Sequence, residues 1–322
     1  MHILVLRFSA LGDVAILQPV LKQRAAANPD VRFTLAAPKL AQPLFEGIQN
    51  VEFLPIEKHR PFKEIWGMLR QVKPDMVADL HGVIRTLRLD LRFWLCGIHV
   101  YRIDKERSSR QRLLRKENKD LKPLKLAWQR YDEVFDRMGL KGGGITVESI
   151  GKRKGDGGER RIGIAPFAQH EGKIWPMANV ERLVELLMLQ QGNRIYLFGG
   201  RGEVEILNQL ASRYGGRVEV CAGKGTLADE MRVMQSLNVM LTMDSANMHI
   251  ASCVGVPVVS IWGATHPAAG FYGWRQNPDW AMQADMPCRP CSMFGNKRCR
   301  YGDYRCLRAI APEEVAEKLL EF

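Results

Sequence analysis

The segment LTMDSANMHIASCVGVPVVSIW, residues Leu241–Trp262, carries the pattern that decides the fold of this chain. The apolar run Val239–Met243 predicts a buried strand, and Asp244-Ser245 then favour the start of a helix. Gly255-Val256-Pro257 predicts the end of that helix, because glycine suits a helix terminus and proline cannot continue its hydrogen bonds. A second apolar run, Val258–Trp262, predicts another strand. The order strand, helix, strand is typical of a parallel sheet.

The same alternation extends over the rest of the chain. We predict further strands at Ile3–Leu6, Phe33–Ala36, Met76–Leu80, Arg161–Ala165, Arg194–Phe198 and Val218–Cys221. Further helices are predicted at Val14–Asn28, Val180–Gln191, Leu227–Ser236 and Pro312–Phe322. Short buried strands that alternate with longer helices indicate an α/β fold with doubly wound parallel sheets.

The alternation restarts near Arg161, after the stretch Lys141–Arg160, which is rich in glycine and charge. Such a composition is typical of a linker between domains. We therefore expect two Rossmann-like domains, residues 1–150 and 151–322, that face a cleft. Ligand sites are expected where the strands of each domain end and their helices begin.

Composition limits the classes of partner. The 322 residues have a net charge of +12, and no apolar run reaches the length of a membrane-spanning helix. The stretch Arg102–Lys125 holds ten basic and four acidic residues, which suits either a solvated surface or a surface that meets acidic groups. Aromatic residues do not interleave with this stretch, and no nucleic-acid motif is present. We expect a cytoplasmic protein with at most peripheral membrane contact.

The first candidate site follows the first predicted strand, in the loop Ser9-Ala10-Leu11-Gly12-Asp13. A dinucleotide fingerprint would place three glycines here, and only Gly12 is present. Asp13 lies in the first helical turn, so it suits two roles. It either caps the helix, or it acts as a general base that takes the proton of an acceptor hydroxyl.

The second candidate site lies at the strand ends of residues 151–322. Lys173 follows the strand Arg161–Ala165 and suits a diphosphate leaving group, since a cation there needs no metal. Asp244-Ser245 begin a helix whose free N–H groups favour an anion. The alternative for Lys173 is a solvated loop residue, and for His249 a buried helix residue with no role in binding.

These motifs together resemble glycosyltransferase family 9, the heptosyltransferases of lipopolysaccharide core assembly. The resemblance is carried by Arg7–Leu21, by the Lys-x-Trp-Pro element at Lys173, and by Asp-Ser-x-x-x-His from Asp244 to His249. It extends to the Gly-x-Thr loop at Gly263. Ala168 and Gln169 replace the hydroxyl pair of the family, and Ala246 replaces a glycine.

The resemblance implies a GT-B fold and an inverting, metal-independent transfer of heptose from ADP-heptose to an acidic glycolipid at the inner membrane face. It implies catalytic roles for Asp13, as base, and for Lys173. The donor-binding residues that it implies are Glu203, Asp244, Ser245, Ala246, His249, Gly263 and Thr265. As acceptor-binding residues we predict Ser9, Gly12, Arg85 and Arg88. No cofactor is expected to be required.

Four cysteines near the carboxyl terminus leave two interpretations open. Their order is Cys288-x2-Cys291-x7-Cys299-x6-Cys306. Four thiolates suit a structural zinc ion, although the second pair is widely spaced for a zinc knuckle. Reduced or adventitiously oxidised thiols are the alternative.

Two other functions compete with heptose transfer at this stage. One is transfer from another nucleotide sugar, since Ala168-Gln169 and Ala246 depart from the family pattern. The other is a non-catalytic protein that binds nucleotides or nucleic acid, suggested by the basic charge.

Overall fold

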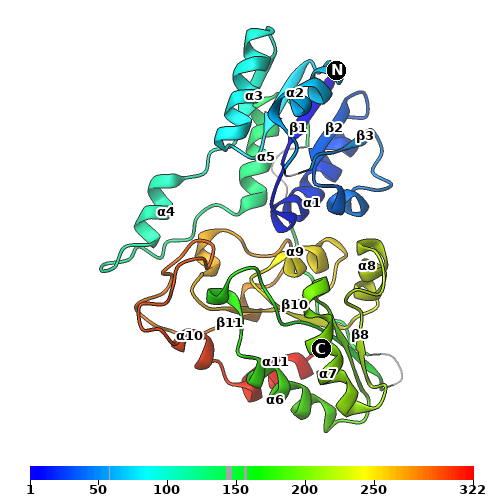
Figure 1. The fold of residues 1–322 in the computed structure, drawn as a ribbon, viewed down its shortest axis with the longest axis vertical. Helices are drawn as coiled ribbons and strands as arrows, with labels where there is room; N and C mark the ends of the chain where they lie inside the picture. Colours follow the sequence, from blue (N-terminus) through cyan, green and yellow to red (C-terminus); the bar gives the residue numbers. More distant parts are fainter. Residues whose placement is uncertain (58, 143–146, 156–157) are drawn as a thin grey trace. The chain divides into compact units, whose positions relative to one another are not determined.

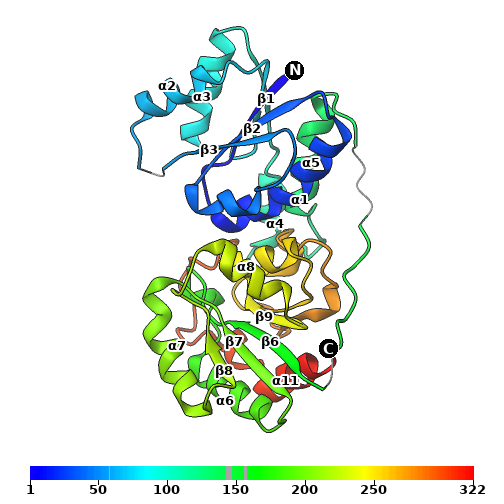
Figure 2. The same cartoon turned by 90° about the vertical axis from the view of Figure 1, so that its right-hand side faces the viewer.

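The computed structural model describes residues 1–57, 59–142, 147–155 and 158–322. The chain divides into two compact units, each built on one sheet (Figures 1 and 2). Unit 1 consists of Met1–Glu106 and Lys125–Val147, and unit 2 of Arg107–Leu124 and Glu148–Phe322. The domain ranges 1–150 and 151–322 remain a prediction, and they differ from the two units mainly at Arg107–Leu124.

Unit 1 contains a five-stranded parallel sheet in the order β3-β2-β1-β4-β5. Its strands are β1 His2–Leu6, β2 Arg32–Ala37, β3 Val51–Pro55, β4 Met76–Asp79 and β5 His99–Arg102. Its helices are α1 Leu11–Ala27, α2 Phe62–Gln71, α3 Ile84–Leu95 and α5 Ala127–Arg137, with a 3-10 turn at Lys39–Leu44. All five residues of β1 are buried, as expected for a central parallel strand covered on both faces.

Helices cover both faces of this sheet. On one face, Leu4 and Leu6 of β1 join a core with Leu69 of α2 and Phe93 of α3. On the other face, the Phe33 ring of β2 meets the Phe135 ring of α5 edge-on, with centroids 6.3 Å apart. Helix α5 also contacts α1. Successive strand residues therefore serve opposite faces, which is the doubly wound arrangement that the sequence predicts.

Unit 2 contains a six-stranded parallel sheet in the order β11-β10-β9-β6-β7-β8. The strands are β6 Arg160–Ala165, β7 Asn193–Leu197, β8 Val218–Val220, β9 Val239–Met243, β10 Val258–Trp262 and β11 Ala281–Gln283. The α-helices are α4 Arg107–Leu113, α6 Met177–Met188, α7 Val204–Ala211, α8 Leu227–Gln235, α9 Ala246–Cys253, α10 Arg305–Arg308 and α11 Pro312–Leu320. Short 3-10 turns lie at Glu171–Lys173, Arg201–Glu203, Ser212–Tyr214, Pro267–Ala269 and Pro278–Trp280.

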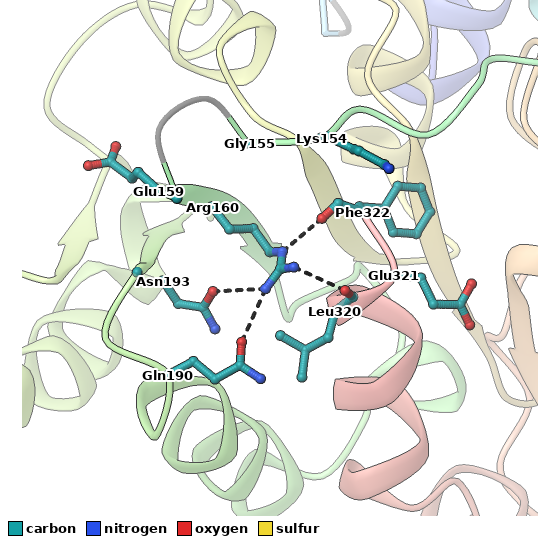
Figure 3. Close-up of a pocket in the computed structure, with 11 residues that line it drawn as sticks. Lys154, Gly155, Glu159, Arg160, Gln190, Asn193, Leu320, Glu321 and Phe322 are labelled. Carbon is teal, nitrogen blue, oxygen red and sulfur yellow. Dashed lines mark hydrogen bonds between the residues drawn. The ribbon is translucent and has the colours of Figure 1, made fainter.

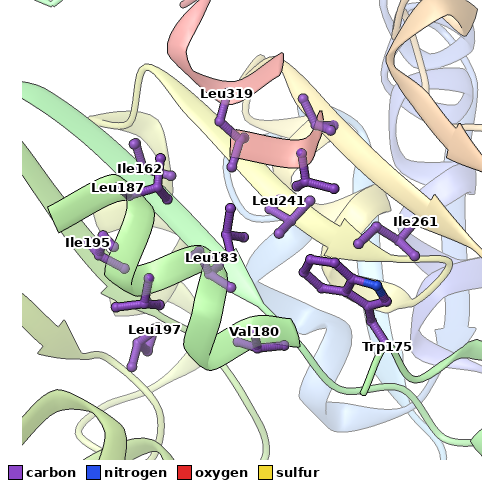
Figure 4. Packing of buried hydrophobic residues seen from close by; sticks show 14 of the residues in the cluster. Ile162, Trp175, Val180, Leu183, Leu187, Ile195, Leu197, Leu241, Ile261 and Leu319 are labelled. Atoms are coloured by element: carbon purple, nitrogen blue, oxygen red, sulfur yellow. The ribbon is translucent and has the colours of Figure 1, made fainter. Parts of the chain in front are cut away.

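The core of unit 2 packs α6 and α11 against one face of its sheet (Figure 4). Leu183 and Leu187 of α6 lie beside Ile162 of β6 and Leu319 of α11 in this cluster. The Trp175 side chain is fully buried among them, and its indole N–H donates to the Ile310 carbonyl at 3.3 Å. This tryptophan therefore fixes the segment that leads from Lys173 into α6.

Part of the predicted linker Lys141–Arg160 belongs to unit 2. The Arg153 guanidinium donates to the carbonyls of Leu237 at 3.2 Å and Gln235 at 2.9 Å. Residues 143–146 and 156–157 of the predicted linker lie outside the described residues.

The basic stretch Arg102–Lys125 is divided between the two units. Arg102 stays in unit 1, where its guanidinium pairs with Asp90 at 2.7 Å. Leu113 of α4 is fully buried in a small apolar cluster of unit 2 that also contains Ala268 and Met293. The Leu124 N–H donates to the Ala268 carbonyl at 2.9 Å. Leu113 and Leu124 therefore anchor this stretch to unit 2, although most of its residues are exposed.

Candidate active-site residues in the two units

In unit 2, the polar segments that we predict to form the donor site follow the carboxyl ends of neighbouring parallel strands. Lys173 follows β6, Asp244 follows β9 and Gly263 follows β10. In a parallel sheet these ends meet at one edge, which is where such folds bind ligands. The topology alone thus brings three distant sequence segments to one edge.

The centre of this edge is an ion pair between Lys173 and Asp244. The Lys173 Nζ lies 2.8 Å from the Asp244 Oδ2, and the two side chains are 16% and 6% exposed. An ammonium has three N–H donors, so Lys173 keeps donors for a further anionic oxygen. The cation is therefore held at the strand edge by a buried carboxylate that also follows a strand.

The first turn of α9 supplies groups suited to an anion. Ser245 is the N-cap residue, but its side chain makes no capping hydrogen bond. The hydroxyl oxygens of Ser245 and Thr265 are buried and have no hydrogen-bond partner among the residues that the structure describes. Buried hydroxyls are normally bonded, so these two favour a ligand that supplies the missing partner. Ala246 begins the helix, and His249 is buried one turn further along.

Close backbone packing supports the loop at Gly263. The Ala264 N–H donates to the Gly172 carbonyl at 2.7 Å. A side chain at Gly263 would meet that carbonyl at 2.6 Å, so this position requires glycine. At Gly295, which has a positive φ of 75°, a side chain would meet the Lys173 stem at 2.6 Å. Gly295 therefore belongs to this site, although the sequence analysis did not identify it.

A buried arginine holds the same loop from behind. The Arg289 guanidinium, 3% exposed, donates to the carbonyls of Gly263 at 2.5 Å, Trp262 at 2.9 Å and Thr265 at 3.0 Å. Sequence analysis missed this residue because no motif marks it. Its role is to position the loop, since all but one of its hydrogen bonds in the structure go to backbone carbonyls, the other going to the Gln283 side chain at 3.2 Å.

Glu203 lies after β7, two strands away from β9 in the same sheet. Its Oε2 accepts the Gly200 N–H at 2.5 Å and so caps the turn. The predicted contact with the nucleoside stays a prediction, and the capping role is the one with a partner in the structure.

In unit 1, Asp13 lies in the first turn of α1, at the carboxyl edge of β1. Its carboxylate pairs with the buried Arg7 guanidinium and accepts the Ala10 N–H at 3.4 Å. The Arg7 side chain also donates to the Leu80 carbonyl at 2.6 Å. The Asp13 side chain remains 26% exposed. The carboxylate is thus oriented from one side and accessible from the other, as a general base needs to be.

His81, which sequence analysis did not single out, lies beside the same loop. The Ser9 hydroxyl and the His81 Nε2 are 3.2 Å apart. Burial, together with the nearby Arg7 guanidinium, lowers the pKa of His81 to about 4, so the imidazole is neutral near pH 7. The Asp79 Oδ1 accepts the N–H groups of His81 and Gly82, each at 2.9 Å, which fixes this turn. Gly12 lies in the first turn of α1 with Asp13.

The predicted acceptor residues Arg85 and Arg88 both lie on α3. Arg85 donates to the Arg60 carbonyl, and Arg88 is exposed. These observations do not identify a substrate, so the acceptor role of both arginines remains a prediction.

The carboxyls of Asp79 and Asp90 are both buried and interact with each other, so we expect the stability of the fold to depend on pH. Burial, with a further contribution from Asp79, raises the pKa of Asp90 to about 7. The folded state then keeps a proton on Asp90 that the unfolded chain loses near pH 4. Stability is therefore lost as pH rises from about 4 to about 7, by up to about 1.4 kcal/mol per pH unit.

The variant Asp90→Asn should remove this loss, because the amide imitates the protonated carboxyl and still accepts from Arg102. Urea unfolding at about pH 5 and about pH 8 measures it. We expect the variant to gain stability relative to wild type at the higher pH. An equal difference between the two proteins at both pH values would contradict the assignment.

The pocket in Figure 3 lies at the opposite edge of the unit 2 sheet. It has a volume of about 480 Å³ and lies where β6 and β7 begin. Arg160 crosses it and donates to the carbonyls of Phe322 at 2.8 Å and Leu320 at 3.1 Å, and to the Asn193 side chain at 3.2 Å. This arginine fastens α11 to the sheet, so we assign the pocket no ligand.

The four carboxyl-terminal cysteines are free thiols. Across the described part of the chain, no three His, Cys, Asp or Glu residues are grouped so as to hold a metal ion. Burial raises the pKa of Cys306 to about 11, so this thiol is protonated near pH 7. The structural-zinc interpretation of Cys288, Cys291, Cys299 and Cys306 thus gains no support from the geometry and stays a hypothesis.

Comparison with known proteins identifies the family. The model of glycosyltransferase family 9 (heptosyltransferase) matches residues 115–301. Lipooligosaccharide heptosyltransferase 2 of Campylobacter jejuni is 25% identical over 167 residues, which are 50% of this chain and 51% of that protein. Lipopolysaccharide heptosyltransferase 1 of Pseudomonas aeruginosa is 24% identical over 334 residues, covering 94% of this chain and 88% of that protein.

Among solved structures, E. coli heptosyltransferase WaaC with ADP has a TM-score of 0.71 and 21% identity, and covers 100% of this chain and 99% of that one. This likeness shows the GT-B fold with two parallel-sheet α/β domains. The family match includes Lys173, Asp244 and Gly263 and begins after Asp13. The chain is a glycosyltransferase that belongs to family 9, the heptosyltransferases.

Proposed function

We propose that this glycosyltransferase moves heptose from ADP-heptose to an acidic sugar of a lipopolysaccharide core. The observation that carries the proposal is the Lys173–Asp244 ion pair beside the unbonded hydroxyl of Ser245 at the start of α9. A diphosphate needs a cation and free N–H donors, and this edge supplies both without a metal. The names of the relatives that it resembles, lipopolysaccharide and lipooligosaccharide heptosyltransferases, support heptose as the sugar.

The chemistry is a single displacement at the anomeric carbon. The acceptor oxygen forms a bond to that carbon, and the bond from the carbon to the diphosphate oxygen breaks. Asp13 takes the acceptor proton, and ADP leaves with the electron pair. Lys173 and the first N–H groups of α9 stabilise the negative charge that develops on the diphosphate. The stereochemistry inverts because only one displacement occurs.

The remaining roles follow from this assignment. Glu203 would meet the ribose hydroxyls, and Asp244 the donor sugar. Ser9, Gly12, Arg85 and Arg88 would serve the acceptor, whose acidic groups suit arginine. The protein would act at the cytoplasmic side of the inner membrane, where a glycolipid acceptor is anchored.

A panel of nucleotide sugars tests the donor. We expect ADP-heptose to raise the melting temperature more than UDP-sugars or GDP-sugars do, because ligand binding stabilises only the folded state. The variant Ser245→Ala/Thr265→Val should weaken ADP-heptose binding about tenfold or more, because each deleted hydroxyl removes a hydrogen bond to a charged oxygen of the donor. Ser108→Ala, at an exposed position of α4, is the matched control.

The outcomes separate the competing donors. A larger shift with UDP-glucose or GDP-mannose than with ADP-heptose would reject the proposed donor. Unchanged ADP-heptose affinity in the double variant would reject the proposed diphosphate site.

A further inference from the structure

Helix α3 has an apolar stripe that no part of the described structure covers. The stripe consists of five exposed side chains: Ile84 at 75%, Leu87 at 37%, Leu91 at 56%, Trp94 at 66% and Leu95 at 69% exposed. Their spacing of three and four residues places them on one side of the helix. Exposed apolar residues are ordinarily scattered singly, so a continuous stripe indicates a surface that meets a partner.

The opposite side of the same helix is already used for folding. Thr86, Leu89, Asp90 and Phe93 are buried there. Phe93 packs edge-on against Trp66 of α2, with ring centroids 5.0 Å apart. The uncovered stripe is therefore additional to the face that the core of unit 1 requires.

Arginines border the stripe along one side. At 100° per residue, Arg88 and Arg92 lie next to the line of Leu91 and Leu95, and Arg85 lies beside them. The Arg92 guanidinium lies 5.4 Å from the centre of the Phe62 ring and 5.5 Å from that of Trp66. Its stem thus follows apolar surface while its charge stays at the edge.

The stripe continues into a groove between α2 and α3, which lie side by side in both views (Figures 1 and 2). The groove has a volume of about 500 Å³. Its lining residues are Phe62, Trp66, Arg88, Leu91, Arg92, Leu95 and Cys96. Aromatic rings, leucines and arginines in one groove suit a ligand with an apolar body and a negative head.

We propose that α3 docks unit 1 onto the surface of an anionic bilayer. The apolar stripe would enter the boundary between headgroups and acyl chains, with Trp94 at the interface and Arg92 on lipid phosphates. The net charge of +12 favours approach to such a surface. No described helix is long and apolar enough to cross the membrane, so the protein would lie on it.

Charge favours a bilayer over a second copy of the chain as the occupant. The one carboxylate of α3, Asp90, is buried, so the exposed sides of this helix present only positive charge. A twofold contact through the stripe would bring two rows of arginines together. A phosphate surface neutralises them instead. Membrane binding by α3 does not depend on which sugar the protein transfers.

Flotation of the full chain with lipid vesicles tests the proposal. We expect it to bind vesicles of phosphatidylcholine with phosphatidylglycerol more tightly than vesicles of phosphatidylcholine alone, and less tightly as salt rises. Leu91→Glu/Leu95→Glu should lower binding to the anionic vesicles by at least about tenfold. The matched control Leu189→Glu/Ile206→Glu makes the same changes at two exposed positions of unit 2 and should bind as wild type does.

Further measurements separate this proposal from the others. The stripe variant should keep its melting temperature, because both side chains are exposed. Equal binding by the stripe variant and wild type, or no preference for anionic vesicles, would overturn the proposal. So would a dimer in gel filtration that the stripe variant dissociates. These assays contain no sugar donor, so their result does not depend on whether the protein transfers heptose.

Discussion

Replacing Asp13 by asparagine should lower the rate of sugar transfer by about 10²–10⁴-fold, the usual contribution of a positioned general base. The amide keeps the size of the side chain and accepts from Ala10, but it cannot take the acceptor proton. ADP binding should be unchanged, because the proposed donor site belongs to unit 2. Release of ADP measures the first quantity, and calorimetric titration with ADP measures the second.

Two further variants make this result specific. Asp30→Asn removes an exposed carboxylate of the same unit and should transfer at the wild-type rate. Asp13→Glu keeps a carboxylate that can both pair with Arg7 and accept a proton, so it should recover part of the rate that Asp13→Asn loses. If Asp13→Asn folds and transfers as fast as wild type, Asp13 is a helix cap and another group is the base.

The strands that sequence analysis missed are all at sheet edges. β3 and β5 are the outer strands of unit 1, and β11 is an outer strand of unit 2. An edge strand is partly exposed, so its residues do not form the continuous apolar run that marks a central parallel strand. In β5, His99 and Arg102 are exposed and interrupt the pattern. The central strands, whose carboxyl ends lead into the candidate sites, are buried apolar runs. They were predicted within one or two residues.

Helix α3 was missed for a related reason. Its sequence, IRTLRLDLRFWL, carries apolar residues on both its packed and its uncovered sides. Its polar side is only the narrow row of Arg85, Arg88 and Arg92, so a search for one apolar face opposite a broad polar face does not single it out. The feature that weakened the prediction is the one that supports membrane docking.

The candidate site was predictable where short motifs lie at strand ends and not where distant segments support them. Lys173 and Asp244 were singled out separately, and the sheet order brings them into contact. Arg289 and Gly295 come from an irregular segment after β11, whose path no local pattern determines. Arg289 also looks like any surface arginine until its burial is known. Only a structure could place these two.

Replacing Lys173 by methionine should have two separable effects. It removes the cation proposed to stabilise the leaving diphosphate, which should lower the rate of transfer about 10²-fold or more. It also leaves the buried Asp244 carboxylate unpaired, which should cost about 3 kcal/mol of folding stability. Methionine keeps the length of the apolar stem against Gly295, so packing is conserved.

The double variant Lys173→Met/Asp244→Asn separates stability from catalysis. Without a carboxylate to neutralise, the fold should regain much of the lost stability in urea unfolding. Transfer should stay impaired, since no cation faces the diphosphate. Lys173→Arg is the conservative control: it restores the charge, and its longer planar head should recover part of the rate. Near wild-type transfer by the double variant would show that the ion pair only holds two strand ends together, and the proposed role of Lys173 would be wrong.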